Sequence, residues 1–143
     1  MQTNRYPSFM IRSDSGTRGP LLGFGTDLCA IDRLARALAA PDRDVLTAMF
    51  TPAEIAAGLA GREPAGMLAA CFAAKEAVVK ALGAAGGQGL FWRDIEVLTV
   101  RGRPRVNLRG RLGDLAAQSG VRRILVSHAR CRCYAMASAL LLA

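Results

Sequence analysis

The chain has 143 residues, of which 52% are hydrophobic and 21% are charged, a composition that can bury a core and excludes an intrinsically disordered chain. The length predicts one domain at residues 20–143, preceded at residues 1–19 by a disordered leader or an expression remnant without apolar periodicity. The formal net charge of +8 indicates a polyanionic partner, which can be nucleic acid, an acidic protein or a phosphate-rich cofactor.

The cysteine and histidine content argues against a zinc or disulfide scaffold. Four cysteines are present without a C-x-x-C pair, and His128 is the only histidine. The N-terminus has no continuous apolar segment that would direct export, so we expect a cytoplasmic protein with reduced thiols. The apolar run at residues 135–143 is too short to span a bilayer and predicts a buried strand.

The first third of the chain predicts a strand followed by short helices. Residues 21–29 form an apolar run interrupted by Gly23 and Gly25, which is typical of a strand that another backbone approaches closely. Apolar residues then recur at helical spacing from Ile31 to Leu38. Further helices are expected to start at Pro41 and at Thr51-Pro52, the latter with Glu54 completing a capping box.

The remainder predicts one long helix and several strands. The long helix begins after Pro64 and ends at Gly83 and the glycines at 86 and 87. Strands are expected at residues 95–100 and 106–108 around a turn at 101–104, and again at 124–127 and 134–142, with a helix at 110–119 between the two pairs. This order of elements indicates an α+β fold.

Three charged side chains in these elements have both a structural and a functional interpretation. Asp27 lies in an apolar strand, where it either caps the helix that begins near Ala30 or has its charge neutralised by a partner. Glu76 precedes Lys80 by four residues on the long helix. The two can form a surface ion pair, or hold a metal and a phosphate beside the glycine-rich loop.

Three ordered motifs resemble one family. They are Gly23-x-Gly25-x-Asp27, the helix Phe72-Ala-Ala-Lys-Glu-Ala-Val-Val-Lys80-Ala, and Asp94-Ile-Glu-Val97. The set is similar to the holo-acyl-carrier-protein synthase type of phosphopantetheinyl transferase. The resemblance spans residues 21–142 and implies the 4'-phosphopantetheinyl transferase fold, with an N-terminal strand, several helices and then a small antiparallel sheet.

The resemblance also implies an activity and its residues. Members transfer 4'-phosphopantetheine from coenzyme A to a serine of an apo acyl carrier protein in fatty acid or polyketide biosynthesis, with Mg²⁺ and with release of 3',5'-ADP. Asp27 and Glu76 are implied as metal ligands, and both are implied with Lys80 in catalysis. The implied coenzyme A contacts are Lys75, Lys80, Gly83, Gly102, Pro104, Ser127 and His128.

The sequence departs from the family pattern at the end expected to hold the 3'-phosphate. Cys71 stands where the family commonly has an arginine, Leu125 replaces a frequent serine, and two additional residues separate His128 from Tyr134. Four nearby arginines can compensate for the lost charge: Arg122, Arg123, Arg130 and Arg132.

The partners follow from the resemblance and from charge. Arg33, Arg36 and Arg43 form a basic group after Asp27 that can dock an acidic carrier protein or can simply be a solvated face. The family's assembly implies a homotrimer with active sites between protomers, and neither nucleic acid nor membrane is expected as a partner. Two alternatives are a small basic nucleic-acid-binding domain, opposed by an aromatic content of only 6%, and an inactive family relative.

Overall fold

The computed structural model describes residues 20–84 and 92–143. Its elements in chain order are β1 (Leu21–Ala30), α1 (Ile31–Ala39), α2 (Asp44–Met49), α3 (Pro52–Leu59), α4 (Pro64–Ala81), the 3-10 turn η1 (Trp92–Asp94), β2 (Ile95–Val100), β3 (Arg103–Leu108), α5 (Gly110–Gln118), β4 (Arg123–Arg130) and β5 (Tyr134–Leu142). The expected leader at residues 1–19 and the glycines at 86 and 87 lie outside the described residues.

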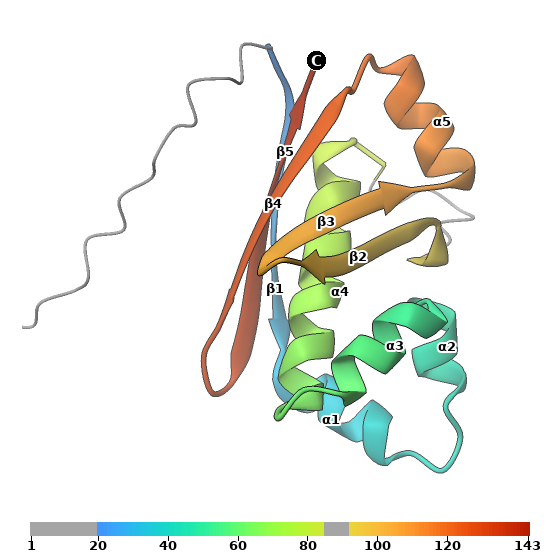
Figure 1. Cartoon of the computed structure of the whole chain (residues 1–143), viewed down its shortest axis with the longest axis vertical. Helices are drawn as coiled ribbons and strands as arrows, with labels where there is room; N and C mark the ends of the chain where they lie inside the picture. Colours follow the sequence, from blue (N-terminus) through green and yellow to red (C-terminus); the bar gives the residue numbers. More distant parts are fainter. Residues whose placement is uncertain (1–19, 85–91) are drawn as a thin grey trace, which may run out of the picture.

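The strands form two antiparallel sheets, one with the order β1-β5-β4 and one made of β2 and β3. The first and last strands of the chain therefore pair, with Asp27 opposite Ala137 in the register. Figure 1 shows α4 lying along the three-stranded sheet, with the β2–β3 hairpin and the short helices α1, α2 and α3 arranged around its other sides. The predicted α+β fold is confirmed.

Small residues let α4 approach the sheet closely. A Cβ atom added at Gly25 would clash with the backbone oxygen of Ala77, and one added at Gly23 would clash with that of Ala81. On the neighbouring strand β5 the residues facing α4 are buried alanines, including Ala137 and Ala139. The close backbone approach expected at the two glycines is therefore confirmed, and it brings β1 against the C-terminal half of α4.

The helix boundaries follow their predicted signals with one exception. Thr51 and Glu54 form the expected capping box at the start of α3. The long helix ends at Ala81 and is stopped by Gly83, whose φ of 68° suits a glycine. The expected helix start at Pro41 is wrong, because α2 begins at Asp44. Pro41 instead ends α1, since the residue before a proline is pushed into an extended conformation.

The length and apolar character of each helix bear on whether it could span a membrane. Among residues 20–84 and 92–143, no helix combines the length and the apolar character that crossing a bilayer requires.

Candidate active site

Asp27 and Lys80 meet where β1 crosses the last turns of α4. Lys80 Nζ donates to Asp27 Oδ1 at 2.7 Å and to the carbonyl oxygen of Thr26 at 3.1 Å. The Asp27 side chain is only 16% exposed, against 44% for that of Lys80. The pKa of Lys80 is raised by its hydrogen bond to Asp27. Asp27 does not cap α1, because the N-cap position is Ala30 and lacks a side-chain cap.

Glu76 lies one turn before Lys80 and close to the same carboxylate. Its pKa is raised first by partial burial and then by the negative charge of Asp27, while Lys80 and Arg33 act in the opposite direction. The predicted surface pair with Lys80 does not form, since that ammonium is turned to Asp27. A carboxylate whose pKa is raised beside a second carboxylate belongs to a donor set that a cation would stabilise.

Arg33 lies over the ring of Phe72, which itself packs against Trp92. Its guanidinium lies 5.3 Å from the ring centre of Phe72, and Phe72 packs against Trp92 with ring centres 5.0 Å apart. Such a cation–π contact restricts a long side chain that would otherwise be mobile. Sequence patterns did not predict this stack, because its members come from α1, α4 and η1, and only the folded chain brings them together.

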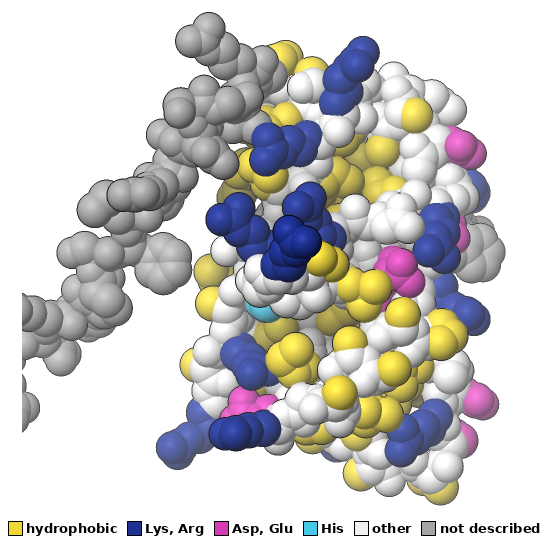
Figure 2. All heavy atoms as spheres, viewed as in Figure 1, with side chains coloured by type: hydrophobic (Ala, Val, Ile, Leu, Met, Phe, Trp, Pro, Cys, Tyr) yellow, Lys and Arg dark blue, Asp and Glu magenta, His cyan; other side chains and the backbone are white. Residues whose placement is uncertain are grey.

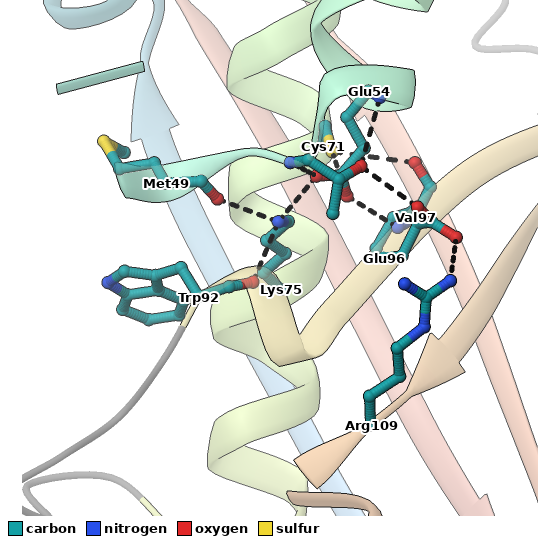
Figure 3. A network of polar contacts seen from close by, with 9 residues as sticks. Met49, Glu54, Cys71, Lys75, Trp92, Glu96, Val97 and Arg109 are labelled. Carbon is teal, nitrogen blue, oxygen red and sulfur yellow. Dashed lines mark hydrogen bonds and ion pairs between the residues drawn. The ribbon is translucent and has the colours of Figure 1, made fainter. Parts of the chain in front are cut away.

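Lys75 does not lie at this site, although it is only one residue from Glu76. Its side chain is fully buried and pairs with Glu54 Oε2 at 2.7 Å. It also donates to the carbonyl oxygens of Met49 at 2.8 Å and Trp92 at 2.9 Å (Figure 3). All three ammonium protons therefore have partners inside the chain. This geometry does not support the expected phosphate contact, and Lys75 instead joins α4 to α2, α3 and η1.

Cys71 belongs to the same buried network. Its Sγ lies 3.4 Å from Glu54 Oε1 and 3.7 Å from the carbonyl oxygen of Val97. Burial and the Glu54 carboxylate raise the pKa of this thiol well above its usual range. Figure 3 shows how Glu54 gathers these groups from separate elements, while Glu96 continues the network to Arg109. The capping box revealed Glu54 in the sequence, but not its buried partners.

His128 lies on the opposite edge of the sheet from Asp27. Both residues are opposite Ala137 in the strand register, so the three form one row whose side chains point to the α4 side. Asp27 contacts Lys80 on one side of α4, whereas His128 lines a cavity with Cys71, whose side chain points to the opposite side of the helix. The pKa of His128 is lowered by burial and then by the charge of Arg130.

His128 lines a cavity of about 610 Å³ between α3, α4, β2 and β4. Arg130 lines it too, and so does Cys71, at the position where the family commonly has an arginine. Figure 2 shows part of the histidine with apolar side chains below it and Lys or Arg side chains above it. The cavity therefore combines an apolar lining with a cationic border.

The other expected coenzyme A contacts are spread around α4. Gly83 follows the helix end near Lys80, and Gly102 is in the β2–β3 turn with a φ of 75°. Pro104 follows it on β3, opposite Thr99. Ser127 precedes His128 on β4, so its side chain points to the other face of the sheet. The expected nucleotide contacts are thus divided between the two sides of α4.

The expected docking arginines all lie on the surface around α1 and α2. Arg36 forms an exposed ion pair with Asp32 at 2.7 Å. Arg43 is exposed at the N-cap position of α2. Arg33 is exposed as well, but it is held on Phe72 beside Glu76. Of the three, Arg33 is therefore the one that connects this basic surface with the carboxylates.

Known proteins resemble this chain in sequence and in fold. Residues 23–136 match the family model described as the 4'-phosphopantetheinyl transferase superfamily. A holo-[acyl-carrier-protein] synthase of Moorella thermoacetica is 47% identical over 121 residues, which cover 84% of this chain and 93% of the relative. One of Chlamydia muridarum is 40% identical over 120 residues, covering 84% and 94%. A structure described as a Chronobacterium ammoniagenes ACPS–CoA complex matches with a TM-score of 0.69 at 28% identity, covering 84% and 96%.

These matches first define the class, which is an enzyme of the phosphopantetheinyl transferase type. Within that class, the chain belongs to the holo-[acyl-carrier-protein] synthase family. The resemblance carried by the three sequence motifs is thereby confirmed, and so is the fold that it implied.

Proposed function

We propose that this chain transfers the 4'-phosphopantetheine arm of coenzyme A to a serine of an apo acyl carrier protein of fatty acid or polyketide synthesis. Mg²⁺ is required, and 3',5'-ADP is released. The observation that carries the proposal is the group formed by Asp27, Glu76 and Lys80, with Asp27 and Lys80 only 2.7 Å apart. We also propose a cytoplasmic location, supported by four cysteines that are all free thiols.

The donor set fits Mg²⁺. Within the described residues, no group of three or more Asp, Glu, His or Cys side chains is positioned to hold a metal. Mg²⁺ usually takes one or two protein carboxylates and completes its octahedron with waters and substrate phosphates. Asp27 and Glu76 supply two carboxylates, and burial together with the charge of Asp27 raises the pKa of Glu76 in the absence of a cation. A bound cation would neutralise charge on the coenzyme A pyrophosphate.

The residues of the chain then bind the phosphates and move one proton. Lys80 can redirect an ammonium proton from the Thr26 carbonyl to a phosphate oxygen, because its side chain is partly exposed. Glu76 accepts the proton of the attacking serine hydroxyl, directly or through one water. Little else is needed, since phosphoryl transfer depends mainly on positioning and charge stabilisation.

We further propose that the active site forms between protomers of a homotrimer. His128 and the carboxylates lie on opposite sides of α4, which supports a site whose nucleotide half comes from a second copy. The outer sheet face supplies an apolar surface for such an assembly. Its exposed side chains are Leu22, Phe24, Leu28, Tyr134 and Met136, at 42 to 60% exposure.

The activity can be tested by weighing an apo acyl carrier protein after incubation with the enzyme, coenzyme A and Mg²⁺. We expect a mass gain of one phosphopantetheine, lost in excess chelator. Asp27→Asn and Glu76→Gln should each lower turnover by about a hundredfold or more, as expected for a lost electrostatic stabiliser. Asp114→Asn, an exposed carboxylate on α5, is the control and should retain activity. Full activity of either site variant, or of wild type in chelator, would refute the assignment.

The shared site can be tested by complementation. A copy carrying Asp27→Asn keeps an intact His128 half, and a copy carrying His128→Ala keeps intact carboxylates. If each site uses two protomers, mixed oligomers from co-expression contain some complete sites. At low coenzyme A concentration, the mixture should therefore exceed the averaged activity of the two separate variants. Activity equal to that average would mean that each protomer works alone.

A further inference from the structure

The turn between β4 and β5 carries two exposed thiols that the proposed reaction does not use. β4 ends at Arg130 and β5 begins at Tyr134, so the turn contains Cys131 and Cys133. The N–H of Cys131 donates to the carbonyl oxygen of Tyr134 at 2.8 Å and closes the turn. Cα atoms two residues apart in a tight turn are about 5 to 6 Å apart, within the range that disulfides span.

The turn is fixed to the body of the protein. The N–H of Ile31, the first residue of α1, donates to the carbonyl oxygen of Cys133 at 2.9 Å. In Figure 1 the β4–β5 turn reaches the end of the molecule where α1 begins. The two thiols are therefore presented together on an anchored turn. The other two cysteines differ, because Cys29 is buried and Cys71 is enclosed by the Glu54 network.

Cys131 has the surroundings of a reactive thiol. The neighbouring backbone N–H groups of Cys133 and Tyr134 lower the pKa of its thiol. A lower pKa means more thiolate at neutral pH, and the thiolate is the form that attacks disulfides. Arg130 and Arg132 flank Cys131 in the sequence. Arg130 pairs with Glu63 at 3.6 Å, so Arg132 supplies the positive charge that favours anionic molecules at the turn.

We propose that this turn is a thiol–disulfide exchange site for small anionic disulfides, with Cys131 as the attacking thiol and Cys133 as the resolving thiol. In the first step the Cys131 thiolate attacks one sulfur of the disulfide, which forms a mixed disulfide and releases one thiolate. Cys133 then loses its proton to solvent and attacks the Cys131 sulfur. This releases the second thiolate and leaves a Cys131–Cys133 bond. Two protein thiols are oxidised, and one disulfide is reduced to two thiols.

The test uses the full chain and glutathione disulfide as the anionic probe, followed by intact-protein mass spectrometry and peptide mapping. Wild type should lose two hydrogens and retain no glutathione, with the new bond between Cys131 and Cys133. Cys133→Ser should accumulate one glutathione on Cys131, because nothing resolves the adduct. Cys131→Ser should react at about one tenth of the wild-type rate or below, since it lacks the activated thiol.

Charge selection is tested with the cationic disulfide cystamine. We expect wild type to react faster with glutathione disulfide than with cystamine after correction for their rates with free cysteine, and Arg132→Gln to reduce that preference. Two results would overturn the proposal. One is a Cys133→Ser variant that gains no adduct, and the other is a Cys131→Ser variant that reacts as fast as wild type.

Discussion

Replacing Lys75 with methionine tests whether this lysine stabilises the fold or binds phosphate. The substitution keeps the length of the side chain but removes an ammonium that is fully buried and pairs with Glu54 at 2.7 Å. Glu54 would keep its hydrogen bonds from the N–H groups of Thr51 and Val97, but its charge would be buried without a counter-ion. Breaking a buried pair in this way costs about 3–5 kcal/mol, a large share of a total stability of about 5–15 kcal/mol.

Urea denaturation at fixed protein concentration measures this cost. With a typical slope of about 1–3 kcal/mol per molar urea, Lys75→Met should lower the midpoint by about 1 M or more. Lys80→Met is the matched control, because it makes the same change on the same helix but removes an ion pair whose lysine is 44% exposed. That pair should contribute about 1 kcal/mol or less.

For coenzyme A affinity we expect the opposite order, with the larger loss in Lys80→Met. In buffer where both variants are folded, calorimetry should find nearly wild-type affinity for Lys75→Met and weaker binding for Lys80→Met. An unchanged urea midpoint together with lost coenzyme A binding in Lys75→Met would refute the structural role and restore the phosphate contact.

Three further predictions concern the proposed site. Burial and the charge of Asp27 raise the pKa of Glu76 in the folded protein, so folding takes up protons and the metal-free protein loses stability as pH rises through the usual glutamate range. In chelator, Glu76→Gln should therefore melt higher than wild type at pH 7, and the difference should vanish near pH 4; no difference at pH 7 would contradict the shift. Arg33→Glu with Arg36→Glu should raise the KM for carrier protein severalfold, while coenzyme A binding measured by calorimetry changes little. Rising salt should weaken the use of carrier protein more in wild type than in the variant. An unchanged KM would reject this docking face. His128→Ala should weaken coenzyme A more than dephospho-coenzyme A, whereas equal weakening would leave His128 a structural role.

Local signals in the sequence predicted most elements, but not how the sheets are assembled. The capping box at Thr51 and the glycine stop at Gly83 involve only neighbouring residues, and the structure confirms both. The pairing of β1 with β5 joins the two ends of the described chain. Such pairing depends on which faces α4 covers and on the small residues that permit its approach, including Gly25 and Ala137.

In the candidate site, too, the local motifs could be predicted from the sequence, whereas the long-range contacts could not. Asp27, Glu76 and Lys80 could be named because each stands in a recognisable motif, but the 2.7 Å contact between Asp27 and Lys80 joins residues 53 positions apart. The sequence alone could not distinguish Lys75 from Lys80, since both are lysines on one helix. Their difference arises from what covers each side of that helix, and the Glu54 network that encloses Lys75 comes from distant segments.

Helix geometry also explains why a cysteine in place of the family's common arginine at position 71 leaves the carboxylates Asp27 and Glu76 undisturbed. Successive residues turn by about 100° around a helix axis, so the Cys71 and Glu76 side chains point about 140° apart. Cys71 accordingly lines the cavity that contains His128, whereas Glu76 lies beside Asp27 on β1. An arginine at position 71 would thus add charge to the cavity and not to the carboxylates. Its absence concerns only the nucleotide half of the proposed site, where Arg130 still supplies positive charge.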